Sequence, residues 1–297
     1  MSHDLRRYAR QTNVRLMAGF ILLLFVVGDG LIYWLYGRNA ALLGVMCLVV
    51  GLLPLLLIWL ILVGLEWWVK RGEGRKMVDG MQTREVKDWV FGERRPTGEG
   101  PHRLLLLLHG WTGDENSMGV FAGRMPEPYW LVAPRGNYAS PLGGYSWFLE
   151  QGKIWPWVDD FRPAMEALFE LLAPENFPGA DLDKIFLGGF SQGAALAYAL
   201  AFLYPQRVQA LAGLAGFLPE GCEALARNRP LRGKAVFVAH GRLDELVPIE
   251  KGRFCVSVLR EAGGEVSYCE DEVGHKLSAE CFGGFREFFR NQTNLFK

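Results

Sequence analysis

Apolar residues are unevenly distributed along the chain, and they gather in two long runs near the amino terminus. The runs cover 16–36 and 41–68, and only residues 37–40 separate them. Each run is long enough to cross a hydrocarbon core of about 30 Å at a helical rise of about 1.5 Å per residue. We therefore predict a two-helix transmembrane hairpin, with a short segment over 1–15 before it and a polar linker over 69–83 after it.

Basic residues predict how this hairpin is oriented. Four basic residues precede the first run, four follow the second run, and the connection between the runs holds one. They are Arg6, Arg7, Arg10 and Arg15 before the first run, Lys70, Arg71, Arg75 and Lys76 after the second, and Arg38 in the connection. Because basic flanks stay in the cytoplasm, we expect a multi-pass protein of the cell inner membrane or plasma membrane, with the following domain facing the cytoplasm. Asp29 lies inside the first run, where a carboxylate is costly. Protonation, access to water, and a polar contact to the second helix or to another copy remain open for it.

From residue 84 onward, short apolar segments alternate with amphipathic ones. Residues 84–95 are expected to form an edge strand, and 103–108, with five consecutive leucines, a central strand buried on both faces. Further strands are predicted at 131–133, 184–187, 208–214, 235–239 and 266–269, and helices at 158–172, 194–202, 249–262 and 279–290. Such alternation predicts an α/β domain over 84–297, with a mostly parallel sheet and helices on both faces.

Composition narrows the possible functions. Half of the 297 residues are apolar, and the net charge is zero, so nothing indicates a nucleic-acid partner. The cysteines are odd in number and form no C-x-x-C pair: Cys47, Cys222, Cys255, Cys269 and Cys281. This pattern indicates neither a zinc site nor a disulfide framework. We expect the cysteines to be small core residues in a reducing compartment.

One short motif joins a predicted strand to a predicted helix. Gly189-Phe190-Ser191-Gln192-Gly193 is the only G-x-S-x-G match in the sequence. In a nucleophile elbow, a tight turn at this point exposes the serine hydroxyl at the carboxyl end of the strand. The backbone N–H of Gln192 then lies at the helix start, where it is free to donate to an oxyanion. A glycine-rich turn around an ordinary serine is the alternative interpretation.

A nucleophilic serine needs a base, and the base needs an orienting group. Asp244 falls in the loop after the predicted strand 235–239, and His275 falls in the loop after the last predicted strand. Both loops belong to the edge of the sheet where Ser191 emerges. Taken singly, Asp244 is as well explained by a turn and His275 by a surface loop. The order Ser191, Asp244, His275 is that of an α/β-hydrolase triad, and the coincidence favours catalysis.

The loop after the five leucines supplies the remaining candidates. The backbone N–H of Trp111 is the candidate second oxyanion donor, and its indole either walls a substrate pocket or simply packs. His109 and His240 each precede a glycine at a strand end. We expect these two histidines to shape loops rather than to act as the base, and we predict no metal and no cofactor.

Several further motifs accompany the elbow: Leu108-His109-Gly110 with Gly113-Asp114-Glu115-Asn116, Ala133-Pro134-Arg135-Gly136, Gly144-Tyr145-Ser146-Trp147-Phe148, the stretch 240–248, and Gly274-His275. With these motifs, 103–290 resembles the phospholipase/carboxylesterase family of α/β-hydrolases, which includes acyl-protein thioesterases and small bacterial carboxylesterases. The resemblance implies an α/β-hydrolase fold and metal-free hydrolysis of carboxylic esters or thioesters through an acyl-serine intermediate. Trp147 and Phe148 join Trp111 as candidate pocket residues. Members of the family usually have no membrane hairpin, so residues 1–83 lie outside the resemblance.

We therefore expect a membrane-anchored serine hydrolase, similar to a carboxylesterase, lysophospholipase or acyl-thioesterase, that acts on small-molecule or lipid-like esters and thioesters. Two alternatives remain. One is an acyltransferase on the same fold, which product analysis with added alcohols distinguishes. The other is a non-catalytic membrane scaffold with a hydrolase-like domain, which an incomplete triad would have favoured.

Overall fold

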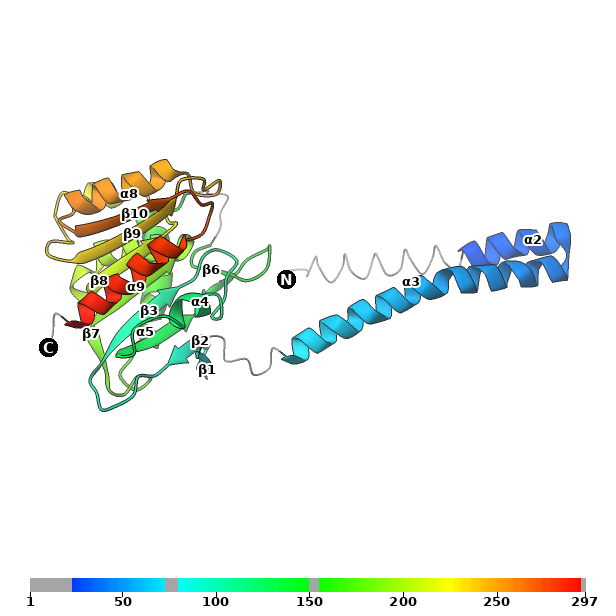
Figure 1. Cartoon of the computed structure of the whole chain (residues 1–297), viewed down its shortest axis with the longest axis horizontal. Helices are drawn as coiled ribbons and strands as arrows, with labels where there is room; N and C mark the ends of the chain where they lie inside the picture. The colour runs from blue at the N-terminus through cyan, green and yellow to red at the C-terminus, as the bar shows by residue number, and fades with distance from the viewer. Residues whose placement is uncertain (1–22, 73–79, 150–154, 295–297) are drawn as a thin grey trace. The chain divides into compact units, whose positions relative to one another are not determined.

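The computed structural model describes residues 23–72, 80–149 and 155–294 (Figure 1). The chain divides into two compact units, Met1–Lys76 and Met77–Lys297. The described part of the first unit consists of a π-helical turn η1 (Leu24–Gly28), helix α2 (Asp29–Tyr36) and helix α3 (Arg38–Gly72). Gly37, with φ of 82°, makes the turn between α2 and α3.

Asp29 lies at the contact between these two helices. Its side chain is buried, and a Cβ atom added at Gly44 of α3 would collide with its carboxylate. Neither carboxylate oxygen has a hydrogen-bond partner among the described residues. The structure thus shows the Asp29 side chain packed against the second helix without the predicted polar contact to it, and protonation remains an expectation.

The membrane predictions need correction. Among the residues that the structure describes, no helix combines the length and the apolar character needed to cross a membrane. The predicted transmembrane hairpin over 16–68 is therefore not supported. The predicted multi-pass membrane location, with the second domain facing the cytoplasm, depended on that hairpin and is withdrawn with it. Residues 1–22 and 73–79 lie outside the described residues.

The second unit is built on one eight-stranded sheet with the order β1-β2-β4-β3-β7-β8-β9-β10. The strands are β1 (Gln82–Val86), β2 (Trp89–Arg94), β3 (His102–Leu108), β4 (Tyr129–Pro134), β7 (Ala180–Phe190), β8 (Val208–Leu214), β9 (Ala235–Gly241) and β10 (Glu265–Asp271). All neighbours from β4 to β10 are parallel, whereas β1 with β2 and β2 with β4 are antiparallel. This confirms the mostly parallel sheet.

The predicted single edge strand over 84–95 is instead a hairpin of two strands. The chain reverses between β1 and β2 at Lys87, whose φ of 52° is unusual for a residue with a side chain. Two short strands, β5 (Tyr138–Ala139) and β6 (Tyr145–Ser146), pair separately as a second small sheet.

Helices cover both faces of the large sheet, as predicted. They are α4 (Gly119–Ala122), α5 (Arg162–Leu171, after the 3-10 turn η3, Val158–Phe161), α6 (Gln192–Leu203), α7 (Cys222–Ala226), α8 (Ile249–Glu261) and α9 (Ala279–Asn294), with a further 3-10 turn η4 (Pro205–Arg207) after α6. The leucines of β3 divide between the faces. Leu104, Leu106 and Leu108 pack in the cluster that includes α5, α6 and α8, and Leu105 and Leu107 pack with α4 and α9. Figure 1 shows α9, in red, along one face of the sheet.

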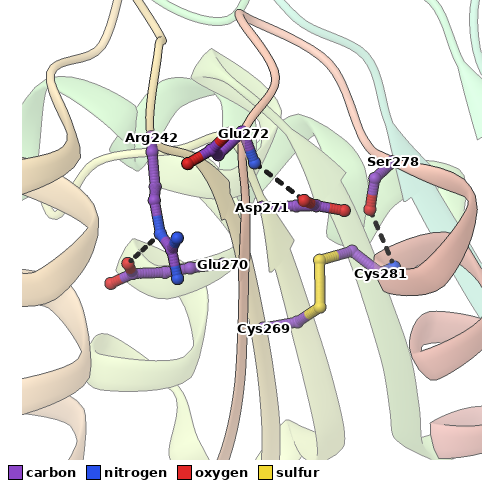
Figure 2. Close-up of a disulfide and its surroundings, with 7 residues drawn as sticks. All are labelled: Arg242, Cys269, Glu270, Asp271, Glu272, Ser278 and Cys281. Carbon is purple, nitrogen blue, oxygen red and sulfur yellow. Dashed lines mark hydrogen bonds and ion pairs between the residues drawn. A yellow bond between two sulfur atoms is a disulfide. The ribbon is translucent and has the colours of Figure 1, made fainter.

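A disulfide joins Cys269 of β10 to Cys281 of α9 (Figure 2). The sequence pattern indicated no disulfide, so that prediction was wrong. The pairing depends on how α9 returns along the sheet, which places the two Cα atoms 5.6 Å apart. Cys222 and Cys255 are buried thiols, as expected, whereas Cys47 is exposed.

Candidate active site

Ser191 occupies the turn between β7 and α6. Its φ of 53° and ψ of −117° are rarely adopted by a residue with a side chain. Its N–H donates a hydrogen bond of 2.8 Å to the carbonyl of Leu214. A Cβ atom at Gly189 would collide with the backbone of Gly193, and one at Gly193 with the backbone of Leu108. The turn therefore needs both glycines of the motif, and it projects the serine from the carboxyl end of β7.

Asp244 and His275 meet at the same edge of the sheet. Asp244 Oδ2 lies 2.7 Å from His275 Nδ1, and Asp244 Oδ1 accepts hydrogen bonds of 2.9 Å from the N–H groups of Leu246 and Val247. Because an ionised carboxylate can only accept, the histidine must donate from Nδ1. In the neutral imidazole this leaves Nε2 as an acceptor, which is the state that a general base requires.

The His275 ring also lies beside the elbow. Its centroid is 5.0 Å from that of Phe190, the residue before Ser191. Ser191 Oγ and His275 form no hydrogen bond among the described residues. Such bonds are often long in a site without substrate. The structure thus brings the three candidate triad residues to one edge, with the acid–base pair already joined.

The loops that hold Asp244 and His275 are joined to each other by their backbones. The N–H groups of Arg242 and Leu243 donate to the carbonyls of Asp271 and Val273, at 2.8 and 3.0 Å. A Cβ atom at Gly241 would collide with the carbonyl of Val273, so the two loops run in close contact. The spacing between the acid and the base is therefore set by the backbone.

An ion-pair group lies next to these loops. Glu270 bonds to Arg253 at 2.8 Å and to Arg242 at 3.2 Å. The hydrogen bond from Arg253 contributes most to lowering the pKa of Glu270 to about 2, with smaller contributions from the nearby Tyr268 and from Arg242, against the effect of partial burial. This carboxylate is consequently charged at neutral pH.

Two backbone N–H groups are candidate oxyanion donors. That of Gln192 is in the first turn of α6, where amides have no partner in their own helix. The loop with Trp111 passes directly over the elbow, because a Cβ atom at Gly110 would lie 3.2 Å from Cβ of Ser191. The N–H of Thr112 donates to the carbonyl of Tyr145 at 3.0 Å and holds this loop in place.

The side chain of Gln192 has a role that the sequence did not indicate. It is buried, and its Oε1 accepts a hydrogen bond of 2.9 Å from the N–H of Trp147, while its Nε2 lies 3.0 Å from Ser146 Oγ. These bonds attach the start of α6 to the segment after β6. The glutamine side chain therefore helps to hold in place the start of α6, which carries its own N–H.

His109 and His240 shape loops, in agreement with the prediction. His109 Nε2 accepts from the N–H of Gly136 at 2.8 Å, and Nδ1 lies 2.7 Å from the carbonyl of Gly110. Burial lowers the pKa of His109, which favours this neutral tautomer. His240 Nε2 lies 2.7 Å from the carbonyl of Val247 and 3.5 Å from Asp244 Oδ2.

A cavity of about 510 Å³ adjoins the elbow at Phe190. Its lining is mainly apolar and comes from the β3–α4 region, the elbow and the start of α9: Gly110, Trp111, Thr112, Gly113, Ser117, Met118, Val120, Phe121, Phe190, Lys276, Leu277 and Phe282. Trp111 is among these residues. Trp147 and Phe148 are not, since both are buried in the core cluster with α5 and α6. The sequence did not predict the pocket wall formed by α4 and α9, because its residues come from distant segments.

In the described part of the chain, no group of three or more His, Cys, Asp or Glu side chains could hold a metal ion.

The chain is similar to proteins that are named as ester hydrolases. A protein of Oryza sativa subsp. japonica named probable carboxylesterase is 30% identical over 130 residues, which cover 43% of this chain and 49% of the rice protein. Acyl-protein thioesterase 1 of Kluyveromyces lactis is 30% identical over 169 residues, 50% of this chain and 72% of the yeast protein. The chain spans about half the length of the first curated relatives that it matches.

A solved structure supports the fold. The crystal structure of the Bacillus cereus carboxylesterase superposes with a TM-score of 0.58 at 23% identity, covering 71% of this chain and 94% of that one. This likeness shows the α/β-hydrolase fold and nothing finer, and it confirms that part of the fold prediction. Residues 96–292, more than half of the sequence, match the phospholipase/carboxylesterase family. The chain therefore belongs to the phospholipase/carboxylesterase family.

Proposed function

We propose that this chain is a serine hydrolase that cleaves carboxylic esters or thioesters, with Ser191 as nucleophile, His275 as general base and Asp244 as the group that orients the base. The observation that carries the proposal is the 2.7 Å bond between Asp244 and His275, located at the same sheet edge as the elbow serine. Membership of the family, and relatives named carboxylesterase and acyl-protein thioesterase, support the same reaction class.

Acylation begins with the substrate carbonyl beside Ser191. Asp244 holds the Nδ1–H tautomer, so Nε2 of His275 takes the serine proton as Oγ attacks the carbonyl carbon. The buried carboxylate stabilises the imidazolium that forms. The N–H groups of Gln192 and Trp111 stabilise the negative charge on the carbonyl oxygen. The intermediate then collapses, the bond to the alcohol or thiol breaks, and the leaving group takes the proton from Nε2.

Deacylation repeats these steps with water as the nucleophile. Water gives a proton to His275 Nε2 and attacks the acyl-serine carbonyl, and the same two N–H groups stabilise the second oxyanion. Collapse breaks the bond to Oγ, the proton returns to Ser191, and the free acid leaves. Every proton in the cycle thus moves between substrate, water, Ser191 and His275.

The cavity supports a substrate with an apolar group next to the reacting carbonyl. Most of its lining is aromatic or aliphatic, and Lys276 is the charged exception among its described lining residues. Pockets of this size and character hold drug-sized apolar groups. Esters and thioesters of acids with a sizeable hydrocarbon part therefore fit best.

The decisive experiment compares the full chain with Ser191→Ala. The unaltered protein is expected to hydrolyse p-nitrophenyl esters or acyl thioesters and to be labelled by a fluorophosphonate probe, and the variant to lose both properties. Turnover that persists in the Ser191→Ala variant would overturn the assignment. Adding an alcohol to the reaction tests for acyl transfer: free acid as the main product supports hydrolysis, whereas a new ester as the main product indicates a transferase.

A further inference from the structure

His275 lies in the middle of a loop whose two ends are covalently joined. The disulfide connects Cys269 of β10 to Cys281 in the first turn of α9, twelve residues later. Figure 2 shows the bond below this loop, with Asp271 and Ser278 near its two ends. The base of the proposed triad therefore depends on a segment that is anchored at both ends, and the two halves of this segment are held in different ways.

The first half is held by backbone hydrogen bonds. The carbonyls of Asp271 and Val273 accept bonds from the loop that contains Asp244. The close approach at Gly241 leaves this half little room to move. Up to residue 274, the base loop is therefore positioned without any contribution from the disulfide.

The second half leads from His275 into α9 and is held more lightly. Ser278 Oγ accepts a hydrogen bond of 3.1 Å from the N–H of Cys281 at the start of the helix. The proximity of Ser278, together with a hydrogen bond of 2.8 Å from the N–H of Glu272, lowers the pKa of Asp271. These bonds are close to solvent, where water competes for each group. The covalent tie at Cys281 is the strong constraint on this side.

The same segment forms one wall of the cavity. Lys276 and Leu277 follow the histidine directly, and Phe282 follows Cys281 in the helix. A shift of the first turn of α9 would therefore move the base and the pocket wall together. Binding and proton transfer both depend on how this turn is held.

The remainder of α9 is anchored independently of the disulfide. Phe285 and Phe289 are fully buried against the sheet, and Tyr129 Oη donates a hydrogen bond of 2.9 Å to the carbonyl of Phe289. Loss of the disulfide is therefore expected to release the second half of the loop and the first helical turn and to leave the rest of the helix packed.

We propose that the Cys269–Cys281 disulfide positions His275 and the adjoining pocket wall, so that full activity requires the oxidised pair. This inference rests on the proposed function, in which His275 is the base. A dithiol reductant converts the disulfide back to two thiols by supplying two electrons and two protons. The S–S bond breaks, each cysteine gains an S–H, and the dithiol becomes its own disulfide.

The test uses the full chain, oxidised and after treatment with dithiothreitol, with reduction of this pair verified by alkylation and mass spectrometry. We expect kcat for a p-nitrophenyl ester to fall about tenfold and KM to rise a few-fold, while far-ultraviolet circular dichroism is unchanged. Reoxidation is expected to restore the rate. The double variant Cys269→Ser, Cys281→Ser should be slow and insensitive to dithiothreitol. Cys47→Ser, which removes an exposed thiol elsewhere, should keep both the full rate and the sensitivity.

Two readouts separate positioning from mere stabilisation. The downfield proton resonance of the His275 Nδ1–H should be present in the oxidised protein and weakened after reduction, whatever the activity. The pH profile of kcat/KM should also change on its acidic limb. If the oxidised protein neither hydrolyses the p-nitrophenyl ester nor reacts with a fluorophosphonate, the proposed function is refuted, and this inference with it. An active protein with unchanged kcat and an unchanged resonance after verified reduction refutes the inference alone.

Discussion

The side chain of Asp244 is fully buried, whereas that of His275, bonded to it at 2.7 Å, keeps 17% of its surface exposed. This difference suits the proposed roles. The carboxylate is shielded from water and accepts three hydrogen bonds, while the histidine retains an exposed edge. A base that must reach both substrate and solvent protons needs such an edge.

The Asp244→Asn substitution tests this relationship. An amide keeps one acceptor oxygen for the loop N–H groups but presents N–H to His275, which favours the wrong tautomer. We expect kcat to fall about 10³–10⁴-fold, as for the equivalent change in a serine protease triad, with KM little altered. Steady-state kinetics on a p-nitrophenyl ester measures the effect. Asp88→Asn, at an exposed turn between β1 and β2, is the matched control and should retain the normal rate.

The fold could be predicted because the local patterns are strong. Five consecutive leucines cannot alternate between core and solvent, so β3 had to be covered on both faces, and Leu104 and Leu105 indeed face different helices. The elbow was recognisable because Gly189 and Gly193 meet backbone atoms where any side chain would collide.

The disulfide and the pocket could not be predicted, because both depend on packing between distant segments. Cys269 and Cys281 are adjacent only because the first turn of α9 lies beside β10. Phe121 and Phe282 stack with centroids 5.6 Å apart although they come from helices far apart in the sequence.

Substituting Gly193 by alanine should destabilise the domain. The added Cβ would collide with the carbonyl of Leu108 in the central strand, and neither backbone segment can move freely. Overpacking of this kind costs about 1–3 kcal/mol, and urea unfolding measures it. Gly283→Ala is the control in α9, where a Cβ meets nothing within 4 Å. There the substitution should stabilise the helix by about 0.5–1 kcal/mol. Equal effects at the two positions would contradict the close contact at the elbow.

Glu270 should make the stability of the domain depend on pH. Arg253, its strongest partner, helps to lower its pKa from 4.5 to about 2 in the folded chain. A lowered pKa means that the stabilisation is complete above the unfolded value and is lost as pH falls through the folded one. Glu270→Gln should therefore be less stable than the unaltered protein at pH 6, and the difference should shrink between pH 4.5 and 2.

Urea unfolding of both proteins over this range gives the measurement. Because the arginines are largely exposed, the difference should also decrease with added salt. A difference that grows as the solution becomes more acidic would show that Glu270 is not stabilised in its charged form.

Lys276 should influence which esters the protein prefers. It borders an otherwise apolar cavity directly after the proposed base, so its charge lies near any group bound there. An acyl chain that ends in a carboxylate gains attraction of about 1 kcal/mol in a water-like medium at 4 Å, and more where water is excluded. We expect Lys276→Glu to lower kcat/KM for a half-ester of a dicarboxylic acid about tenfold or more, relative to a neutral ester of equal length. Lys184→Glu makes the same charge change at an exposed position in the amino-terminal half of β7, and it should leave the ratio of the two rates unaltered. If both variants shift that ratio equally, the effect belongs to the overall charge of the protein, and Lys276 does not select the substrate.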